Sequence, residues 1–314
     1  MKLNVAVQMD PIARINIRGD STFALLLEAQ KRGHGAFLLH PGQALAARRG
    51  AGGAGADADR ARRGRRSLHA GRAEARAADR ISTSSCCGRT RRSISPTSPR
   101  RIFSSGIHPK TLVVNDPASV RNAPEKLFVM DFPQLMPPTL ISRDLDEINA
   151  FRDKHGAVVM KPLHGHGGAA VFRVMPQDMN FGSLFDMFSV TFREPWVIQR
   201  FLPEVKHGDK RIILVDGEFA GAVNRVPAPD DLRSNMVRGG AAQATDLTAR
   251  EREICATLGP ALRERGLLFV GIDVIDGNLT EINVTSPTGI RAIARLDGPD
   301  VAAKIWDAHR GEAG

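Results

Sequence analysis

The stretch from Leu268 to Ile290 constrains the fold most, because it predicts a strand hairpin that carries acidic side chains. Apolar residues alternate on both sides of the turn Asp276-Gly277-Asn278, a sequence typical of tight hairpins. Residues two apart on a strand share a face, so Glu281 and Asn283 point the same way, and the hairpin can bring Asp273 opposite them. Two carboxylates and an amide oxygen on one face suit Mg²⁺. The alternative is that these side chains simply line the solvated face of an amphipathic hairpin.

A glycine-rich turn follows a predicted strand that ends at Lys161. In the segment HGHGGAAVFRV, Gly165, Gly167 and Gly168 allow unusual backbone conformations, so their N–H groups can wrap phosphate oxygens. Such a turn is weak evidence alone, since ordinary hairpins use glycine too, and its spacing is not that of a Walker loop. Without further evidence, Lys161 and the upstream Lys126 would be interpreted as lysines exposed to solvent.

Taken together, these residues form a pattern that resembles the ATP-grasp carboxylate–amine ligases. The segment EINVTSPTGIR is very similar in sequence to the bacterial glutathione synthetase family. The N-terminal MDP, the dipeptide Asn16-Ile17 and STFALLLEAQKRGH carry the same resemblance, which runs over residues 1–40 and 107–308. It implies an α/β (α+β) chain with an ATP-grasp fold. The implied parts are an N-terminal substrate domain at 1–120, a nucleotide-binding subdomain at 121–203 and a C-terminal catalytic subdomain at 204–314.

The resemblance also assigns roles to particular residues of this chain. ATP would be held by Lys126, Lys161, Gly165, Gly167, Gly168, Gln199, Phe201, Leu202 and Asp209. Mg²⁺ or Mn²⁺ would be held by Asp273, Glu281 and Asn283, and charge on the transferred phosphoryl group would be stabilised by Arg211, Arg225 and Arg233. The peptide substrate would be bound by Ser286, Thr288, Gly289 and Asn235. Phe201 and Leu202 equally suit a place in the core.

The remaining elements follow from local patterns. Residues 3–9 alternate as a strand, and Asp20-Ser21 can cap a helix that ends at Gly33. Further strands are predicted at TLVVND, TLISRD and WVIQRFLP, a hairpin around Asp216-Gly217, and helices over DLDEINAFRDKHG and residues 248–265. In the last helix Cys255 faces inward, so it is a core residue in preference to a nucleophile.

Residues 227–243 combine Pro, Gly, Ser and Asp without periodicity and predict a surface loop. The loop contains Arg233, Asn235 and Arg238, which could close over an anionic intermediate and exclude water. An ordinary flexible connection is the alternative. Composition alone favours that alternative.

Residues 41–106 interrupt the resemblance. They contain 15 Arg, no Lys and four acidic residues, so their net charge is +11 and that of the remaining chain is −1. With two Leu, three Ile, one Phe and no Val or Met, the segment has too few apolar groups to offset the entropy of ordering it. Three interpretations compete: a disordered basic linker, a nucleic-acid-binding arm, and translation out of frame.

The codon table favours the third interpretation. A reading shifted by two bases over residues 81–106 can spell a segment containing RQDPPFD, which resembles a family motif that helps to bind the peptide substrate. The shifted reading then rejoins the existing Ile107-His108-Pro109. We therefore hypothesise a compensated frameshift, and no residue between 41 and 106 inherits the role of that motif.

The resemblance implies that the chain joins glycine to γ-glutamylcysteine through an acyl phosphate, with ATP and Mg²⁺ as cofactors, and forms a homo-oligomer, a tetramer in the family. Three alternatives stay open: another ATP-grasp ligase, a nucleic-acid-binding protein that uses residues 41–106, and an inactive homologue. The chain has no run of 18 apolar residues and no signal-peptide pattern, and its three cysteines form no disulfide framework. We expect a cytoplasmic protein with no membrane or nucleic-acid partner.

Overall fold

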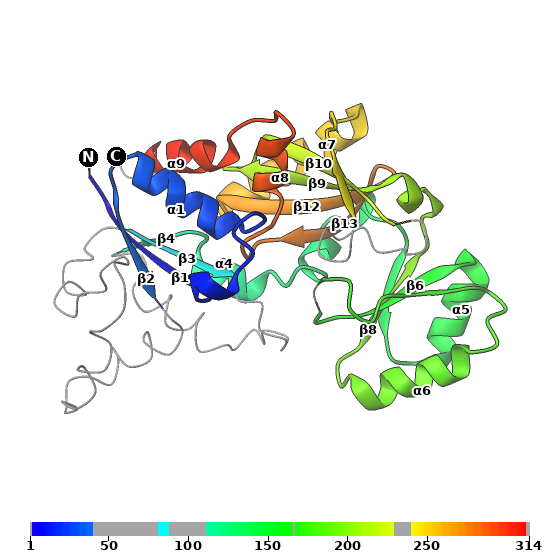
Figure 1. The fold of residues 1–314 in the computed structure, drawn as a ribbon. Helices are drawn as coiled ribbons and strands as arrows, with labels where there is room; N and C mark the ends of the chain where they lie inside the picture. Colours follow the sequence, from blue (N-terminus) through cyan, green and yellow to red (C-terminus); the bar gives the residue numbers. More distant parts are fainter. Residues whose placement is uncertain (1, 40–80, 88–110, 166, 229–239, 312–314) are drawn as a thin grey trace, which may run out of the picture.

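The structure is a computed structural model that describes residues 2–39, 81–87, 111–165, 167–228 and 240–311. Three sheets organise these residues, and Figure 1 shows them spread along the molecule with the N-terminal sheet at one end and the sheet of β6 and β8 at the other. The mixed α/β composition agrees with the fold class expected from the sequence. No helix in these ranges is long and apolar enough to cross a membrane.

The N-terminal sheet is parallel, with the order β2-β1-β3-β4. Its strands are β1 (Asn4–Met9), β2 (Gly35–Leu39), β3 (Ile81–Cys87) and β4 (Leu112–Val113). Helix α1 (Ser21–Lys31) connects β1 to β2, and Asp20 caps it by accepting a hydrogen bond from the N–H of Phe23. This strand–helix start confirms the predicted α/β beginning of the chain.

Strand β3 corrects one sequence-based expectation. The sequence predicted no regular structure between residues 41 and 106, yet β3 lies inside that segment and pairs with β1 and β4. Local composition missed the strand because its pairing partners supply the order. The rest of the segment, residues 41–80 and 88–106, lies outside the described residues.

The second sheet is antiparallel, with the order β5-β8-β6-β7, and carries helices α5 and α6. The strands are β5 (Thr139–Ser142), β6 (Val158–Pro162), β7 (Phe172–Val174) and β8 (Trp196–Arg200), and the helices are α5 (Leu145–His155) and α6 (Phe181–Thr191). Asp144 caps α5 and Gly156 ends it with φ at 76°. Trp196 and Phe188 are fully buried and anchor a core that belongs to this sheet alone.

The third sheet is antiparallel, with the order β11-β10-β9-β12-β13, and it lies at the centre of the molecule (Figure 1). Its strands are β9 (Asp209–Val215), β10 (Glu218–Val226), β11 (Ala241–Gln243), β12 (Phe269–Ile275) and β13 (Asn278–Asn283). Its helices are α7 (Ala249–Glu264), α8 (Ile290–Arg295) and α9 (Val301–Gly311). Thr248 and Glu251 form a capping box at the start of α7, and Cys255 is buried on its inner face, as predicted.

The two faces of the central sheet pack against different partners. Ile213 and Phe269 belong to one core with β1, α1, α8 and α9, whereas the neighbouring Ile212 belongs to another with α7 and residues 120–135. This alternation is what a strand buried on both faces requires. Arg211 lies two residues before Ile213, and Asp273 lies four residues after Phe269. Both side chains therefore take the face of the sheet that packs against α1.

Short elements complete the fold. They are α4 (Pro117–Asn122) and the 3₁₀ turns η1 (Ile12–Arg14), η3 (Phe128–Asp131), η4 (Pro133–Leu135) and η5 (Pro203–His207). Phe128, Val129 and Leu135 pack into the core beneath the central sheet. This packing places the neighbouring Lys126 beside β13, where Ile282 donates its N–H to the carbonyl of Glu125.

Candidate active site

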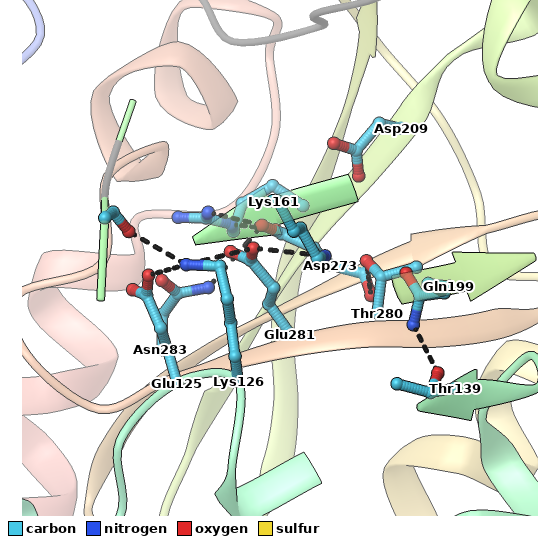
Figure 2. Close-up of polar contacts among 12 residues, drawn as sticks. Glu125, Lys126, Thr139, Lys161, Gln199, Asp209, Asp273, Thr280, Glu281 and Asn283 are labelled. Atoms are coloured by element: carbon cyan, nitrogen blue, oxygen red, sulfur yellow. Dashed lines mark hydrogen bonds and ion pairs between the residues drawn. The ribbon is translucent and has the colours of Figure 1, made fainter. Parts of the chain in front are cut away.

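The β12–β13 hairpin places the three predicted metal-binding residues together, as Figure 2 shows. Asp273 pairs with Glu281 across the two strands, and Gly271 pairs with Asn283. The Nδ2 atom of Asn283 lies 3.5 Å from Oδ2 of Asp273. The hairpin therefore has the cross-strand arrangement predicted from the alternation of its residues.

Two arginines surround the carboxylate of Asp273. Arg211 donates from Nε to Oδ1 at 2.5 Å and from Nη2 to Oδ2 at 2.9 Å, and Nη2 of Arg225 lies 2.9 Å from Oδ1. Burial alone raises the pKa of Asp273, but the charges of the two arginines outweigh it and lower that pKa to about 2. Asp273 is therefore an anion throughout the physiological range.

Arg225 joins Asp273 to Asp209. Its Nη2 lies 2.6 Å from Oδ2 of Asp209, and its Nε donates to the backbone carbonyl of the same residue at 3.2 Å. The side chain is only 3% exposed. Burial lowers the pKa of this guanidinium, but the two carboxylates outweigh burial and raise it. Arg211, Arg225, Asp209 and Asp273 thus form one network on β9, β10 and β12, and all but Asp209 are buried.

Lys126 and Lys161 converge on Glu281. Their Nζ atoms lie 3.7 and 3.6 Å from Oε1 of Glu281, and both side chains are buried. Burial lowers the pKa of Lys161, whereas for Lys126 the charges of Glu281 and Glu125 outweigh burial and raise the pKa. Lys161 lies on a strand, β6, as the sequence predicted. Both lysines are buried, so the alternative that they are exposed to solvent is wrong.

The glycine-rich turn begins beside Lys126. The ammonium group donates to the carbonyl of Gly165 at 2.8 Å and to Oε1 of Glu125 at 2.6 Å. Gly167 and Gly168 have φ at 65° and 71°, in the left-handed region where other residues are strained. The turn between β6 and β7 therefore has the backbone freedom that the sequence predicted for contact with phosphate oxygens.

The residues expected at the adenine lie at the end of β8. The amide of Gln199 donates from Nε2 to Oγ1 of Thr139 at 2.9 Å, so Thr139 orients it (Figure 2). Leu202 is buried, at 8% exposure, and the N–H of Phe201 donates to the carbonyl of Ala157. These contacts place the three residues along one strand end, and their role toward adenine stays a prediction.

The loop that carries Ser286, Thr288 and Gly289 follows β13 and contacts the start of α1. The Oγ atom of Ser286 and the Oγ1 atom of Thr22 lie 3.0 Å apart, and the hydroxyl of Ser21 donates to the carbonyl of Pro287 at 2.8 Å. Ser286 has φ at 44° and Gly289 has φ at 125°. Arg211 donates to the carbonyl of Thr288 at 3.1 Å, so one side chain touches both this loop and Asp273.

Two predicted site residues, Arg233 and Asn235, lie outside the described residues, as does most of the loop expected over 227–243. Their roles stay predictions. The other predicted site residues come from β6, β8, β9, β10, β12, β13 and the loops beside them. Lys126 and Lys161 both pair with Glu281, which lies opposite Asp273 in the pairing of β12 with β13.

The donor set fits a magnesium ion that is shared with a nucleotide. Within the described parts of the chain, no group of three or more His, Cys, Asp or Glu side chains is arranged to hold a metal by itself. Mg²⁺ typically takes one or two protein carboxylates and completes its shell with phosphate oxygens and water. Asp273, Glu281 and the amide oxygen of Asn283 offer such a partial set beside two lysines.

Sequence reasoning missed five residues of this site: Glu125, Thr139, Thr280, Ser21 and Thr22. Glu125 carried a signal, because it directly precedes Lys126 and the two side chains pair. Ser21 and Thr22 carried none, since their partners lie more than 260 residues away in the sequence. Thr280 also carried none, because its contact depends on an irregularity in the strand pairing.

Comparison with known proteins identifies matching families for both parts of the chain. A model of the ATP-grasp domain of prokaryotic glutathione synthetase matches residues 125–298. A model of the N-terminal domain of the same family matches residues 3–82. The N-terminal match extends beyond residue 40, where the sequence analysis placed the end of the resemblance.

Relatives from bacteria match almost the whole chain. A glutathione synthetase of Bradyrhizobium diazoefficiens is 73% identical, over 98% of this chain and 98% of the relative. One from Agrobacterium fabrum is 52% identical, over 97% of this chain and 95% of the relative. Both comparisons span more than nine-tenths of this chain.

Solved structures show the same fold at low identity. The D-cycloserine synthetase DcsG aligns with a TM-score of 0.65 at 17% identity, over 98% of this chain and 99% of that one. A D-alanine–D-alanine ligase of Bacillus anthracis, complexed with ATP, aligns with a TM-score of 0.59 at 14% identity, over 99% of this chain and 100% of that one. These similarities confirm the ATP-grasp fold.

Proposed function

Because this chain belongs to the prokaryotic glutathione synthetase family, we propose that it joins glycine to γ-L-glutamyl-L-cysteine at the expense of ATP. The products are glutathione, ADP and phosphate. A carboxylate is a poor electrophile because it is anionic, so the cysteinyl carboxylate first accepts the γ-phosphoryl group of ATP. The glycine amine then attacks the carbonyl carbon of this acyl phosphate, loses a proton and displaces phosphate.

One observation carries this proposal: Asp273 and Glu281 lie opposite each other on β12 and β13, and two buried lysines converge on Glu281. A triphosphate needs both cations and metal-binding oxygens in one place, and this arrangement supplies both. Lys126 and Lys161 would bind the phosphates, and Gly165, Gly167 and Gly168 would donate backbone N–H groups to them. Gln199, Phe201, Leu202 and Asp209 would hold the adenosine.

Asp273, Glu281 and Asn283 would hold Mg²⁺, or Mn²⁺ in its place. When bound, the ion neutralises charge on the phosphate oxygens and orients them for transfer. The arginines keep Asp273 ionised and hold its carboxylate in place before the nucleotide binds. Arg211, Arg225 and Arg233 would stabilise charge on the transferred phosphoryl group.

The acid substrate would bind at the loop after β13. Ser286, Thr288 and Gly289 would hold a carboxylate of the peptide, and Asn235 would contribute from the loop over 227–243. Arg211 connects this loop to the metal-binding carboxylate through its contacts with the Thr288 carbonyl and Asp273. The position of the acid relative to the γ-phosphate is therefore coupled to the arrangement of the metal site. Positioning of this kind suffices for phosphoryl transfer, without a protein nucleophile.

Phosphate release tests the proposal. The purified chain is incubated with ATP, Mg²⁺ and γ-glutamylcysteine, and with glycine or a panel of other amines. The proposed reaction predicts phosphate release that depends on both substrates and is largest with glycine. Mass spectrometry should detect glutathione in the same reaction. Stronger release with another acid or amine would identify a different ATP-grasp ligase. No release with any pair would indicate the inactive homologue considered above.

We also propose a homo-oligomer, by resemblance to the family, and a cytoplasmic location. Light scattering of the purified chain measures the first, and fractionation of the producing cells measures the second. The alternative of a nucleic-acid-binding protein predicts binding to DNA or RNA that falls steeply with salt. A titration at two salt concentrations distinguishes it from the ligase.

A further inference from the structure

Thr280 is an extra residue in the pairing of β12 with β13. Asp273 pairs with Glu281, and the next residue, Val274, pairs with Leu279. Thr280 therefore has no residue opposite it, which defines a β-bulge. Bulges bend a strand and change the direction of the side chains beside them, and they are frequent next to active sites.

The bulge reverses which face of the sheet the following residues occupy. Leu279 and Glu281 are two apart, so on a regular strand they would point the same way. In the structure Leu279 is fully buried in the core beneath the sheet, together with Ile282. Glu281 instead faces Lys126 and Lys161 on the other side. Without the extra residue, the side chains of Leu279 and Glu281 would point to the same face of the sheet.

The hydroxyl group of Thr280 ties the bulge to the metal-binding strand. Its Oγ1 atom donates to the backbone carbonyl of Asp273 at 3.1 Å, and Thr280 is 7% exposed. Figure 2 shows Thr280 among the residues of the site, with the label of Asp273 next to it. A bulge locally disrupts the ladder of backbone hydrogen bonds, and a buried carbonyl needs a donor. The hydroxyl supplies a donor to the backbone carbonyl of the residue whose side chain would bind the metal.

We propose that Thr280 is a positioning residue: its hydroxyl holds the bulge that sets Glu281 opposite Asp273 and thereby fixes the spacing of the two carboxylates that bind the metal–nucleotide complex. This inference rests on the proposed function of the same site. Thr280 need not touch the substrate. Its effect is transmitted through the backbone of Asp273 and through the adjacent peptide of Glu281.

The variants Thr280→Ser and Thr280→Ala test the proposal, since they differ by a single oxygen atom. Binding of Mn²⁺ in the presence of ADP is measured by electron paramagnetic resonance, without any turnover. We expect Thr280→Ala to weaken this binding by about 10- to 100-fold, the range typical of residues that orient metal ligands. Thr280→Ser should bind within about twofold of the wild type, because it retains the donor.

A matched pair at Thr257 controls for loss of a hydroxyl elsewhere. Thr257 also donates from Oγ1 to a backbone carbonyl, that of Glu253, but on the exposed side of α7. Thr257→Ser and Thr257→Ala should both bind Mn²⁺–ADP like the wild type. Near-ultraviolet circular dichroism compares the folding of all four variants.

Kinetics provide a second measurement. In Thr280→Ala, the KM for ATP and the Mg²⁺ requirement should rise together, while the KM for γ-glutamylcysteine changes less than threefold. Equal Mn²⁺–ADP binding by the Ser and Ala variants, or equal weakening in both, would overturn the proposal. If the wild type releases no phosphate, the proposed reaction fails, but Mn²⁺–ADP binding still decides the role of Thr280. If Thr280→Ala does not fold whereas Thr280→Ser does, the hydroxyl is required for the fold itself and the positioning role is rejected.

Discussion

Arg211 binds both carboxylate oxygens of Asp273, with Nε–Oδ1 and Nη2–Oδ2 distances of 2.5 and 2.9 Å. The remaining terminal nitrogen of the same guanidinium, Nη1, donates to the carbonyl of Thr288. Only an arginine can make these three contacts at once, because its donors are fixed in one plane. A single buried side chain therefore connects the metal-binding strand with the loop expected to bind the acid substrate.

The variant Arg211→Lys should disturb both halves of the site. Lysine keeps the charge but loses the two-pronged contact, so we expect kcat/KM to fall at least tenfold, with higher KM values for both ATP and γ-glutamylcysteine. The free energy of unfolding should fall, by less than the roughly 3–5 kcal/mol that follows removal of a buried partner altogether. Steady-state kinetics and urea unfolding measure the two effects.

Arg263→Lys is the matched control for that variant. Arg263 pairs with Glu218 at 2.9 Å, and both side chains are exposed. Such pairs contribute about 0–1 kcal/mol, so the control should keep the wild-type kinetics and stability. Similar kinetics for Arg211→Lys and Arg263→Lys would contradict the connecting role of Arg211.

Substitution of Thr22 should change the KM for the acid substrate and leave the KM for ATP unchanged. Its hydroxyl meets that of Ser286, which has φ at 44°, and both residues are buried. A typical buried hydrogen bond contributes about 1 kcal/mol, so Thr22→Val should raise the KM for γ-glutamylcysteine roughly fivefold. Thr22→Ser should restore the wild-type value. An equal rise in the KM for ATP would show that the contact merely supports the fold.

Cys255 should be chemically inert in the folded protein. Burial, with a smaller effect of Glu251, raises the pKa of the Cys255 thiol to about 12, so almost no thiolate forms at pH 8. Iodoacetamide should label this residue only after unfolding in urea, as measured on the peptide that contains it. Cys255→Ala should retain full activity, and loss of activity at unchanged stability would instead indicate a nucleophile.

The same thiol predicts a pH dependence of stability. An unfolded chain ionises Cys255 near its ordinary pKa of 9.0, whereas the folded chain does so only near 12. The stability contributed by this group is therefore complete below pH 9 and is lost as the pH rises toward 12. Unfolding free energies measured at pH 8 and pH 10 should differ less in Cys255→Ala than in the wild type. An equal difference in both proteins would refute this assignment.

The encoding DNA tests the frameshift hypothesis for residues 41–106. We expect two compensating insertions or deletions across codons 40–107, relative to the genes of the relatives. A repaired chain that contains RQDPPFD should bind γ-glutamylcysteine with a lower KM than the present chain. A continuous natural frame without such changes would reject the hypothesis, and unchanged kinetics after repair would show that the segment has no role in the reaction.

The sequence by itself determined the elements whose signals are local. Asp20 caps the helix that follows it, as predicted, and the helices predicted over DLDEINAFRDKHG and residues 248–265 form as α5 and α7. The alternation around Asp276-Gly277-Asn278 predicted the hairpin and the pairing of Asp273 with Glu281. These features depend on residues within a few positions of one another, where backbone geometry and hydrogen-bonding groups act directly.

Only the tertiary structure decided the contacts between distant residues. The bulge at Thr280, the approach of Thr22 to Ser286 and the burial of Lys126 and Lys161 have no local signal. Each depends on how β9, β12, β13 and α1 pack, which is a balance of burial and strand register over the whole chain. Strand β3 shows the same limit, because its neighbours β1 and β4 order residues that composition alone describes as unstructured.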